Sequence, residues 1–290
     1  MLKREEFKKY PLIYIIGHKH IDADSVISSY ILSGILKSFG INSEYAILDK
    51  NYEIVADDCN LIKDHLNYEP VVLKQSDIET SFFILVDHNN PIQSIGSRGT
   101  VLAAVDHHFM NNDMSNCLIG EYASTASLIY ATYKNTYHFS NYEKTLIILA
   151  ILSDTSYLRT SRYKEKDAKM LLELNRELHL DFDELRKKYF ITNDFNQGIE
   201  YNFYSNYKKY KFDEIEFECS YVRANNIDNK YLDEYLTRLQ KEKNDWLFIW
   251  FDYDESKTYA FFKNKEGINK ISYDFIASRA NDIIKDVINL

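Results

Sequence analysis

Aspartate and histidine residues gather at three places in the first half of the chain. His18, Asp22 and Asp24 lie in the stretch HKHIDADS. Asp87 begins an Asp-His-Asn stretch, and residues 106–108 read Asp-His-His. Imidazole and carboxylate groups together suit divalent transition metals such as Mn, Fe, Co and Zn. Two such ions about 3.5–4 Å apart can clamp a phosphoryl group and activate a bridging water, so these residues indicate a two-metal hydrolytic site.

Each of the three places lies at or just beyond the end of a short apolar segment that reads as a buried strand, at residues 12–16, 81–86 and 101–105. Apolar residues at helical spacing predict intervening helices, such as residues 26–39, which stop at Gly40. This alternation predicts an α/β fold, a doubly wound and mainly parallel sheet with helices on both faces. Ligands bind beyond the carboxyl ends of such strands, so the three places should share one rim.

A further acidic residue, Asp154, follows the apolar helix predicted over residues 142–152. It joins the others if that helix ends at the same rim. Any one of these aspartates could instead be a turn former or a helix cap, and Asp24 or Ser25 could simply cap the helix that starts at residue 26. Three strands that each deliver aspartate and histidine at their tips are much harder to explain in that way.

The pattern changes in the last third of the chain. Its predicted elements are a helical connector, a half-exposed strand and a hairpin, at residues 193–211, 215–222, and 246–253 with 257–262. We therefore predict two domains. Residues 1–190 would form the metal-binding catalytic domain, and residues 191–290 a smaller C-terminal α/β domain.

Composition limits the classes of partner. The 290 residues carry a formal net charge of −9, which gives no broad basic field for duplex nucleic acid. The three cysteines are odd in number and far apart, which argues against a disulfide framework and a Cys-x-x-Cys zinc site. The longest apolar stretch, near residues 146–152, is far shorter than a membrane span. We expect a cytoplasmic protein with no membrane partner.

The motifs resemble those of the DHH phosphoesterase superfamily. GHKHIDADS is similar to its Gly-His-x-Asn-Pro-Asp-x-Asp-Ser signature, VDHN and VDHH to its second and third motifs, and SDT to its fourth. Order and spacing fit over residues 12–180. The Asp-His-Asn second motif and the lack of a downstream Gly-Gly-Gly-His point to the family II manganese-dependent inorganic pyrophosphatases, with exopolyphosphatase-related proteins next. Residues 212–290 weakly resemble the small C-terminal domain (DHHA2-like) of the pyrophosphatases.

The resemblance implies a pair of Mn²⁺ ions, with Co²⁺ or Mg²⁺ as alternatives, that share Asp87. The implied ligands are His18, Asp22 and Asp87 for one ion, and Asp24, His107, Asp154 and Asp87 for the other. It also implies that His108 faces the substrate and acts in catalysis, and that His88 acts beside it. Asn89 and His20 would bind the substrate, and Asp106 would support a neighbouring imidazole or backbone group.

Three departures from the family's pattern concern residues that the resemblance places against the substrate. The family's Asn-Pro is His-Ile here, at residues 20–21. The family's Ser-Arg-Lys-Lys corresponds to residues 278–281, where Arg279 remains as the catalytic and substrate-binding cation without its two lysines. A further lysine near the start of that domain has no clear counterpart, because Gly198 and Ile199 fall near its place. Candidate replacements are Arg159, Arg162, Lys263 and Lys265.

Three functions follow from these residues. The leading hypothesis is hydrolysis of a small phosphate-containing substrate, inorganic pyrophosphate, by a hydroxide that two metals activate. The second keeps the chemistry and changes the substrate to polyphosphate, a nucleotide or an oligonucleotide phosphodiester. The third is a degenerate, non-catalytic metal-binding regulator. The resemblance also suggests a homodimer.

Overall fold

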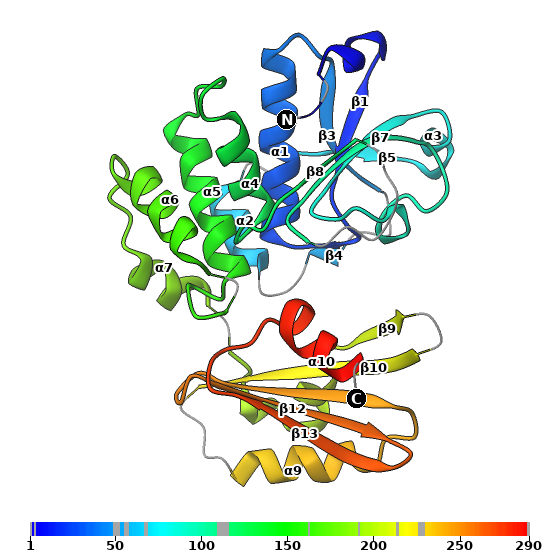
Figure 1. Ribbon diagram of the computed structural model, residues 1–290, viewed down its shortest axis with the longest axis vertical. Coiled ribbons are helices and arrows are strands. Elements are labelled where there is room, and N and C mark those ends of the chain that lie inside the picture. The colour runs from blue at the N-terminus through cyan, green and yellow to red at the C-terminus, as the bar shows by residue number, and fades with distance from the viewer. Residues whose placement is uncertain are drawn as a thin grey trace. The chain divides into compact units, whose positions relative to one another are not determined.

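A computed structural model describes residues 2, 4–48, 53–54, 58–66, 69–108, 116–161, 163–190, 192–212, 215–225 and 230–288. The chain divides into two compact units (Figure 1). Unit 1 comprises residues 1–158 and 163–190, and unit 2 comprises residues 159–162 and 191–290. Within the described residues, no helix is both long and apolar enough to cross a membrane.

Unit 1 is built on a six-stranded sheet in the order β5-β3-β1-β6-β7-β8, in which every neighbouring pair is parallel. The strands are β1 (Ile13–Ile16), β3 (Ser43–Leu48), β5 (Val71–Leu73), β6 (Phe82–Val86), β7 (Thr100–Asp106) and β8 (Cys117–Ile119). The chain moves outward from β1 to β5 and then returns to the other side of β1 as β6. The winding direction therefore reverses between β1 and β6, which is where open α/β sheets bind ligands.

The helices of unit 1 supply most of its core. They are η1 (Arg4–Lys9), α1 (Ala23–Ser38), α2 (Cys59–His65), α3 (Gln75–Ile78), η3 (Pro91–Gln93), α4 (Thr125–Tyr133), α5 (Asn141–Asp154), α6 (Glu165–Asn175) and α7 (Phe182–Tyr189). Helices α1, α4 and α5 pack together on the face of the sheet that carries Ile15 and Ile84 (Figure 1). On the other face, Ile78 of α3 and Ile95 pack against Phe83.

The sequence explains where helix α1 begins and ends, and why helix α5 is buried on all sides. Helix α1 begins at Ala23 because Asp22 and Ser25 form a capping box, three residues before the predicted start. It ends before Gly40, whose φ of 74° terminates the helix in the left-handed region. Every residue from Leu146 to Leu152 of α5 is buried, as expected for a helix that is apolar all round.

Unit 2 contains a five-stranded sheet in the order β13-β12-β11-β10-β9. Its elements are η4 (Phe195–Gln197), α8 (Ile199–Ser205), β9 (Lys208–Phe212), β10 (Ile215–Ala224), α9 (Lys230–Leu239), β11 (Trp246–Asp252), β12 (Lys257–Asn264), β13 (Gly267–Tyr273), a π-helix η5 (Arg279–Ile283) and α10 (Ile284–Ile288). Strands β10 and β11 are parallel, and the other pairs are antiparallel. Phe203 of α8 and Tyr235 of α9 pack with Trp246, Phe248 and Trp250 on one face.

The predicted fold class is confirmed, with one local error. The α/β sheet of unit 1 and the smaller sheet of unit 2 both form, and β11 and β12 make the predicted hairpin. The predicted helical connector over residues 193–211 is wrong in its last part, because α8 ends at Ser205 and β9 begins at Lys208. Strand β9 reads KKYKF and, in the part of the chain that the structure describes, pairs only with β10, so it is a charged edge strand without an apolar stripe.

Candidate metal centre

The three aspartate- and histidine-bearing segments meet at the carboxyl ends of the parallel strands. His18 follows β1, Asp87 follows β6, and His107 follows β7. Because β1 and β6 are neighbours and the winding reverses between them, His18 and Asp87 lie at the switch point itself. We call this group the rim, and its members are His18, Asp22, Asp24, Asp87, His107 and Asp154.

The first cluster of the rim joins His18, Asp22 and Asp87. His18 Nε2 lies 3.3 Å from Asp22 Oδ2 and 3.2 Å from Asp87 Oδ2. Asp22 caps α1 by accepting a hydrogen bond from Ser25 N through Oδ1, at 2.9 Å, which leaves Oδ2 directed at the imidazole. Burial alone would lower the pKa of His18, but Asp22 and Asp87 raise that pKa well above its ordinary value.

The second cluster joins Asp24, His107 and Asp154. His107 Nε2 lies 3.3 Å from Asp154 Oδ2, 3.3 Å from Asp87 Oδ1 and 4.0 Å from Asp24 Oδ2. Asp154 is the last residue of α5, so that helix does end at the rim. Asp87 thus places one carboxylate oxygen near each of the two imidazoles.

The tautomer of His107 tests whether this cluster fits a metal ion. Its Nδ1 lies 3.0 Å from the carbonyl oxygen of Tyr122, which can only accept, so Nδ1 carries the proton and Nε2 presents a lone pair. Nε2 is buried and has no hydrogen-bond partner within the described part of the chain. A lone pair that faces carboxylate oxygens is repelled by them unless a cation lies between, so these donors fit a divalent metal.

Asp24 is held from a neighbouring helix that the predicted site did not include. It accepts hydrogen bonds from Thr125 N at 2.6 Å and Ala126 N at 2.9 Å. Thr125 Oγ1 also donates to Asp87 Oδ1 at 3.0 Å, so the first turn of α4 contacts both carboxylates. Burial, followed by repulsion from Asp87, raises the pKa of Asp24 to about 8. The Ser124-x-x-Ser127 capping box before an apolar run is the sequence signal for this helix start.

Asp87 combines an unusual backbone with a strongly acidic side chain. Its φ is 61°, in the left-handed region that non-glycine residues rarely adopt. Its N–H donates to Val105 O at 3.0 Å, which ties the turn to the neighbouring strand β7. Burial would raise the pKa of Asp87, but the neighbouring imidazoles of His107 and His18 hold that pKa well below its usual range. The carboxylate of Asp87 is therefore fixed in position and ionised.

His108 is oriented by its neighbours in a manner suited to substrate contact. Asp106 Oδ1 accepts from His108 N at 3.0 Å and lies 2.9 Å from His108 Nδ1. Asn89 Nδ2 donates to the other oxygen of Asp106 at 2.7 Å. The side chain of His108 is 34% exposed, whereas that of His107 is 2% exposed. His108 thus keeps Nε2 for a proton or a substrate oxygen.

His88 and His20 occupy different surroundings from those of His108. His88 is buried, its Nδ1 lies 2.8 Å from Val86 O, and its Nε2 lies 2.7 Å from Ser94 Oγ. Burial lowers the pKa of His88 to about 4, so the ring is neutral and both nitrogens are engaged. This geometry supports the turn after β6, and the predicted catalytic contact would require one of these bonds to break. His20 is exposed in β2 (His20–Ile21), which pairs with β4 (Glu53–Ile54).

In unit 2, Arg279 lies beside aromatic side chains and another arginine. The guanidinium carbon of Arg279 is 5.1 Å from the centroid of the Tyr221 ring, and that of Arg223 is 5.5 Å from it. Burial would lower the pKa of Arg279, but Tyr210 and Tyr221 raise it above its ordinary value. Arg279 is therefore a permanent cation.

Strand register adds a lysine that the predicted site did not include. Cys219, Tyr221 and Arg223 alternate along β10 and so share one face of the sheet. Lys208 of β9 pairs directly with Cys219, so its side chain lies on that face too. We call Lys208, Arg223 and Arg279 the cation face. The sequence does not predict the position of Lys208, because β9 lacks the apolar pattern by which a strand is recognised.

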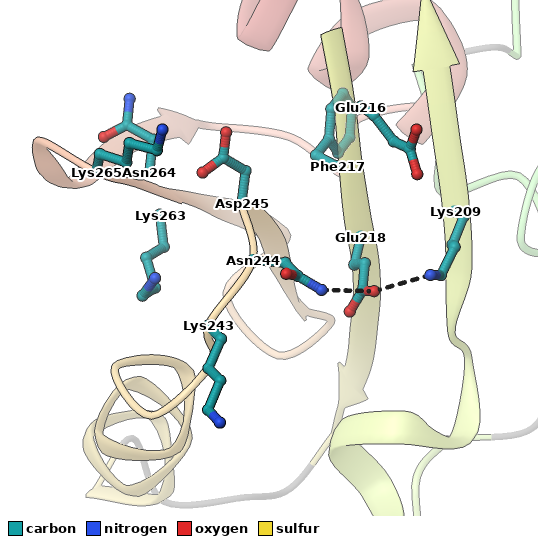
Figure 2. Close-up of a pocket in the computed structure, with 10 residues that line it drawn as sticks. All are labelled: Lys209, Glu216, Phe217, Glu218, Lys243, Asn244, Asp245, Lys263, Asn264 and Lys265. Carbon is teal, nitrogen blue, oxygen red and sulfur yellow. Dashed lines mark hydrogen bonds and ion pairs between the residues drawn. The ribbon is translucent and has the colours of Figure 1, made fainter.

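The other candidate cations have different surroundings. The guanidinium carbon of Arg159 is 5.3 Å from the ring centroid of Tyr253. Lys263 and Lys265 line a pocket together with acidic residues at one end of the five-stranded sheet (Figure 2). Arg162 lies outside the described residues.

Sequence comparison agrees with the rim geometry. Residues 12–155 match the DHH family, N-terminal domain. This part of the chain is a DHH-family domain. The match begins one residue before β1 and ends one residue after Asp154, so it contains every member of the rim. The DHH-family domain is thus the part of the protein that carries the candidate metal ligands.

Three known proteins illustrate the similarity. A Lactobacillus helveticus protein named a probable manganese-dependent inorganic pyrophosphatase is 25% identical over 178 residues, which cover 59% of this chain and 56% of that protein. The chain thus spans about half the length of the curated relatives it matches. A Methanococcus jannaschii structure assigned to family II inorganic pyrophosphatases aligns with a TM-score of 0.72 and 18% identity, covering 96% of this chain and 98% of that one. An exopolyphosphatase-related protein from Bacteroides fragilis aligns with a TM-score of 0.54 and 15% identity, covering 98% and 93%. The structural matches establish a shared fold.

Proposed function

We propose that this protein is a metal-dependent phosphohydrolase that hydrolyses inorganic pyrophosphate. The observation that carries the proposal is the buried Nε2 lone pair of His107, which faces Asp87 and Asp154 and fits a divalent cation. His18, Asp22 and the second oxygen of Asp87 form an adjoining cluster for a second ion. The names of the curated relatives, probable manganese-dependent inorganic pyrophosphatases, support manganese as the metal and pyrophosphate as the substrate.

The chain's own residues account for orientation and proton handling. Divalent cations, when bound, would supply positive charge for the phosphoryl oxygens and lower the pKa of a water. In the reaction, the water oxygen bonds to one phosphorus and the bridging P–O bond breaks. The electron pair stays on the leaving phosphate, which also receives a proton. His108 would donate that proton from Nε2, because its Nδ1 already forms a hydrogen bond with Asp106.

The test measures phosphate release by protein that has been stripped of metal and reloaded. With Mn²⁺ or Co²⁺, we expect the wild type to release phosphate from pyrophosphate and Asp154→Asn to lose nearly all of that activity. Asp77→Asn is the matched control, because Asp77 is an exposed carboxylate at the start of α3. Absence of phosphate release with Mn²⁺, Co²⁺ and Mg²⁺, in protein shown to bind the metal, would contradict the proposal.

A further inference from the structure

The imidazole of His107 is linked to a carboxylate outside the rim through a single peptide unit. Its Nδ1–H donates to the carbonyl oxygen of Tyr122 at 3.0 Å. The N–H of the same peptide unit belongs to Ala123, and it donates to Asp167 Oδ1 at 3.1 Å. A continuous row of hydrogen bonds therefore runs from Asp167 to the imidazole whose Nε2 lone pair faces the rim.

Asp167 is fixed at the start of helix α6 and is fully buried, with 0% of the residue exposed. Its second oxygen, Oδ2, accepts a hydrogen bond from Lys164 N at 3.0 Å and so forms part of the capping box of α6. A buried carboxylate needs hydrogen bonds to replace the water that it has lost, and each oxygen of Asp167 receives one from a backbone N–H. One of its oxygens is thus held in place against Ala123.

The peptide unit between Asp167 and His107 can transmit the effect of the carboxylate. The nitrogen and the carbonyl oxygen of an amide belong to one conjugated system. A carboxylate that accepts from the N–H increases the negative charge on the carbonyl oxygen, and hydrogen bonds in such a chain strengthen one another. A stronger acceptor at the carbonyl of Tyr122 increases the electron density at Nε2 of His107, which makes the imidazole a better metal ligand.

We propose that Asp167 is a positioning residue for His107. Through the peptide unit it strengthens the hydrogen bond at Nδ1, and so it tightens metal binding by the cluster that contains Asp24, His107 and Asp154. The inference rests on the metal-dependent part of the proposed function. Asp167 lies beyond residues 12–155, which match the DHH family, N-terminal domain. A helix outside the matched residues would therefore tune a metal ligand inside them.

The capping boxes of other helices suggest a variant that separates this effect from the start of α6. In α1 and α4, a serine occupies the position of Asp167, and Ser25 Oγ and Ser127 Oγ accept from the N-cap N–H at 3.2 and 3.1 Å. Asp167→Ser can therefore keep the cap of α6, while it removes the carboxylate oxygen that Ala123 contacts.

Helix α3 provides the matched control. It begins with the same Lys-x-x-Asp capping box as α6, in which Asp77 Oδ2 accepts from Lys74 N at 3.3 Å. Asp77 is exposed, and its carboxylate contacts in the described part of the chain stay within residues 74–81. Asp77→Ser thus makes the same change to a capping box without touching the row of hydrogen bonds that leads to His107.

The first measurement is the Kd for Mn²⁺, determined by calorimetry on the metal-stripped full chain. We expect Asp167→Ser to raise this Kd about ten- to hundredfold, as is usual when the group that supports a metal-binding imidazole is lost. Asp77→Ser should bind Mn²⁺ as the wild type does. If Asp167→Ser has a lower melting temperature than Asp77→Ser, Asp167→Asn takes its place, because asparagine keeps the shape of the side chain.

The second measurement is the proton NMR resonance of His107 Nδ1–H, recorded with diamagnetic Mg²⁺. We expect the resonance to remain in Asp167→Ser but to move upfield, because the proton is more shielded in a weaker hydrogen bond. Loss of the resonance would show that Asp167 merely holds the chain in place, which would overturn the inference.

Two results of the calorimetry would also overturn the inference. One is a Kd for Mn²⁺ that is the same in Asp167→Ser as in the wild type, and the other is an equal loss of affinity in Asp77→Ser. A wild type that binds Mn²⁺ but releases no phosphate from pyrophosphate would contradict the proposed function alone. The Kd and the proton resonance would then still decide the role of Asp167.

Discussion

The rim and the cation face are assembled in different ways. At the rim, six side chains come from the tips of parallel strands and the ends of two helices, and several are fixed by hydrogen bonds to backbone amides or hydroxyls. On the cation face, the charges extend sideways from neighbouring strands and from the start of a π-helix. The first arrangement depends on where elements end, and the second on how two strands are aligned.

The two regions also have opposite electrostatic requirements. The rim crowds buried carboxylates together, to the point that burial and Asp87 raise the pKa of Asp24 to about 8. The cation face places Arg223 and Arg279 around one ring. A bound divalent cation would relieve the repulsion among the carboxylates of the first region, whereas the second region carries positive charge. Variants of each region should therefore have separable effects on metal binding and on substrate binding.

The largest expected effect is that of Asp87→Ala. This substitution removes the carboxylate that lies near both imidazoles of the rim. Activity should fall by about a thousandfold or more, because metal-ion stabilisation is worth several kcal/mol. Metal content measured by atomic emission should fall with it. A variant that retains both metal and activity would show that Asp87 is not a shared ligand.

Removal of the metal should destabilise the fold. A chelator leaves the carboxylates of the rim facing one another without a cation between them. An ion that binds only the native state stabilises that state by about 2.7 kcal/mol when its free concentration is a hundred times its Kd. The melting temperature should therefore be lower in chelator than in excess Mn²⁺. Arg279→Gln should show the same metal-dependent difference as the wild type. Identical melting curves with and without metal would contradict the candidate centre.

Arg279→Gln should separate an effect on the substrate from an effect on metal binding most clearly. We expect kcat/KM for pyrophosphate to fall roughly thirtyfold, which corresponds to about 2 kcal/mol for one charge-assisted contact. The Kd for Mn²⁺, measured by calorimetry, should stay at the wild-type value. A comparable loss of metal affinity would show that the effect arises from the rim.

The smallest expected effect is a pH dependence at Cys219. Burial raises the pKa of this thiol to about 11, although Arg279 and Lys208 oppose the shift. The folded state therefore keeps a proton that the unfolded state loses near pH 9, so stability is complete below pH 9 and declines as pH rises toward 11. By pH 10 the loss reaches about 1 kcal/mol. Denaturant titrations should show a steeper decline from pH 8 to 10 in the wild type than in Cys219→Ala, and equal slopes would argue against a buried thiol.

Much of the rim could be predicted from sequence because its residues adjoin strong local signals. Asp87 and His107 directly follow or end apolar strands, and a parallel sheet brings such ends to one edge. Asp154 required one further assumption, that α5 ends there, and it does. The contact of Thr125 with Asp87 could not be predicted in this way, because it depends on the docking of α4 against the strands.

The cation face was harder to predict for a physical reason. Edge strands are stabilised by pairing on one side only and often carry lysine, so β9 lacks the continuous apolar run that identifies β7. If β9 is not recognised as a strand, the pairing of Lys208 with Cys219 cannot be predicted. Nothing in the sequence then distinguishes Arg223 from the other basic residues. His88 illustrates a similar limit, because its motif does not show that Ser94 Oγ lies 2.7 Å from its ring.

The left-handed backbone at Asp87 has a consequence for selection. A non-glycine residue with a φ of 61° carries a conformational cost of about 1–2 kcal/mol, which glycine would avoid. Pressure for thermal stability alone would thus favour glycine at this position. An aspartate there is best understood as a trade-off, in which the chain accepts a less stable turn in order to keep a carboxylate between two imidazoles. Proteins of this fold that lose the chemistry should be free to relax this turn first.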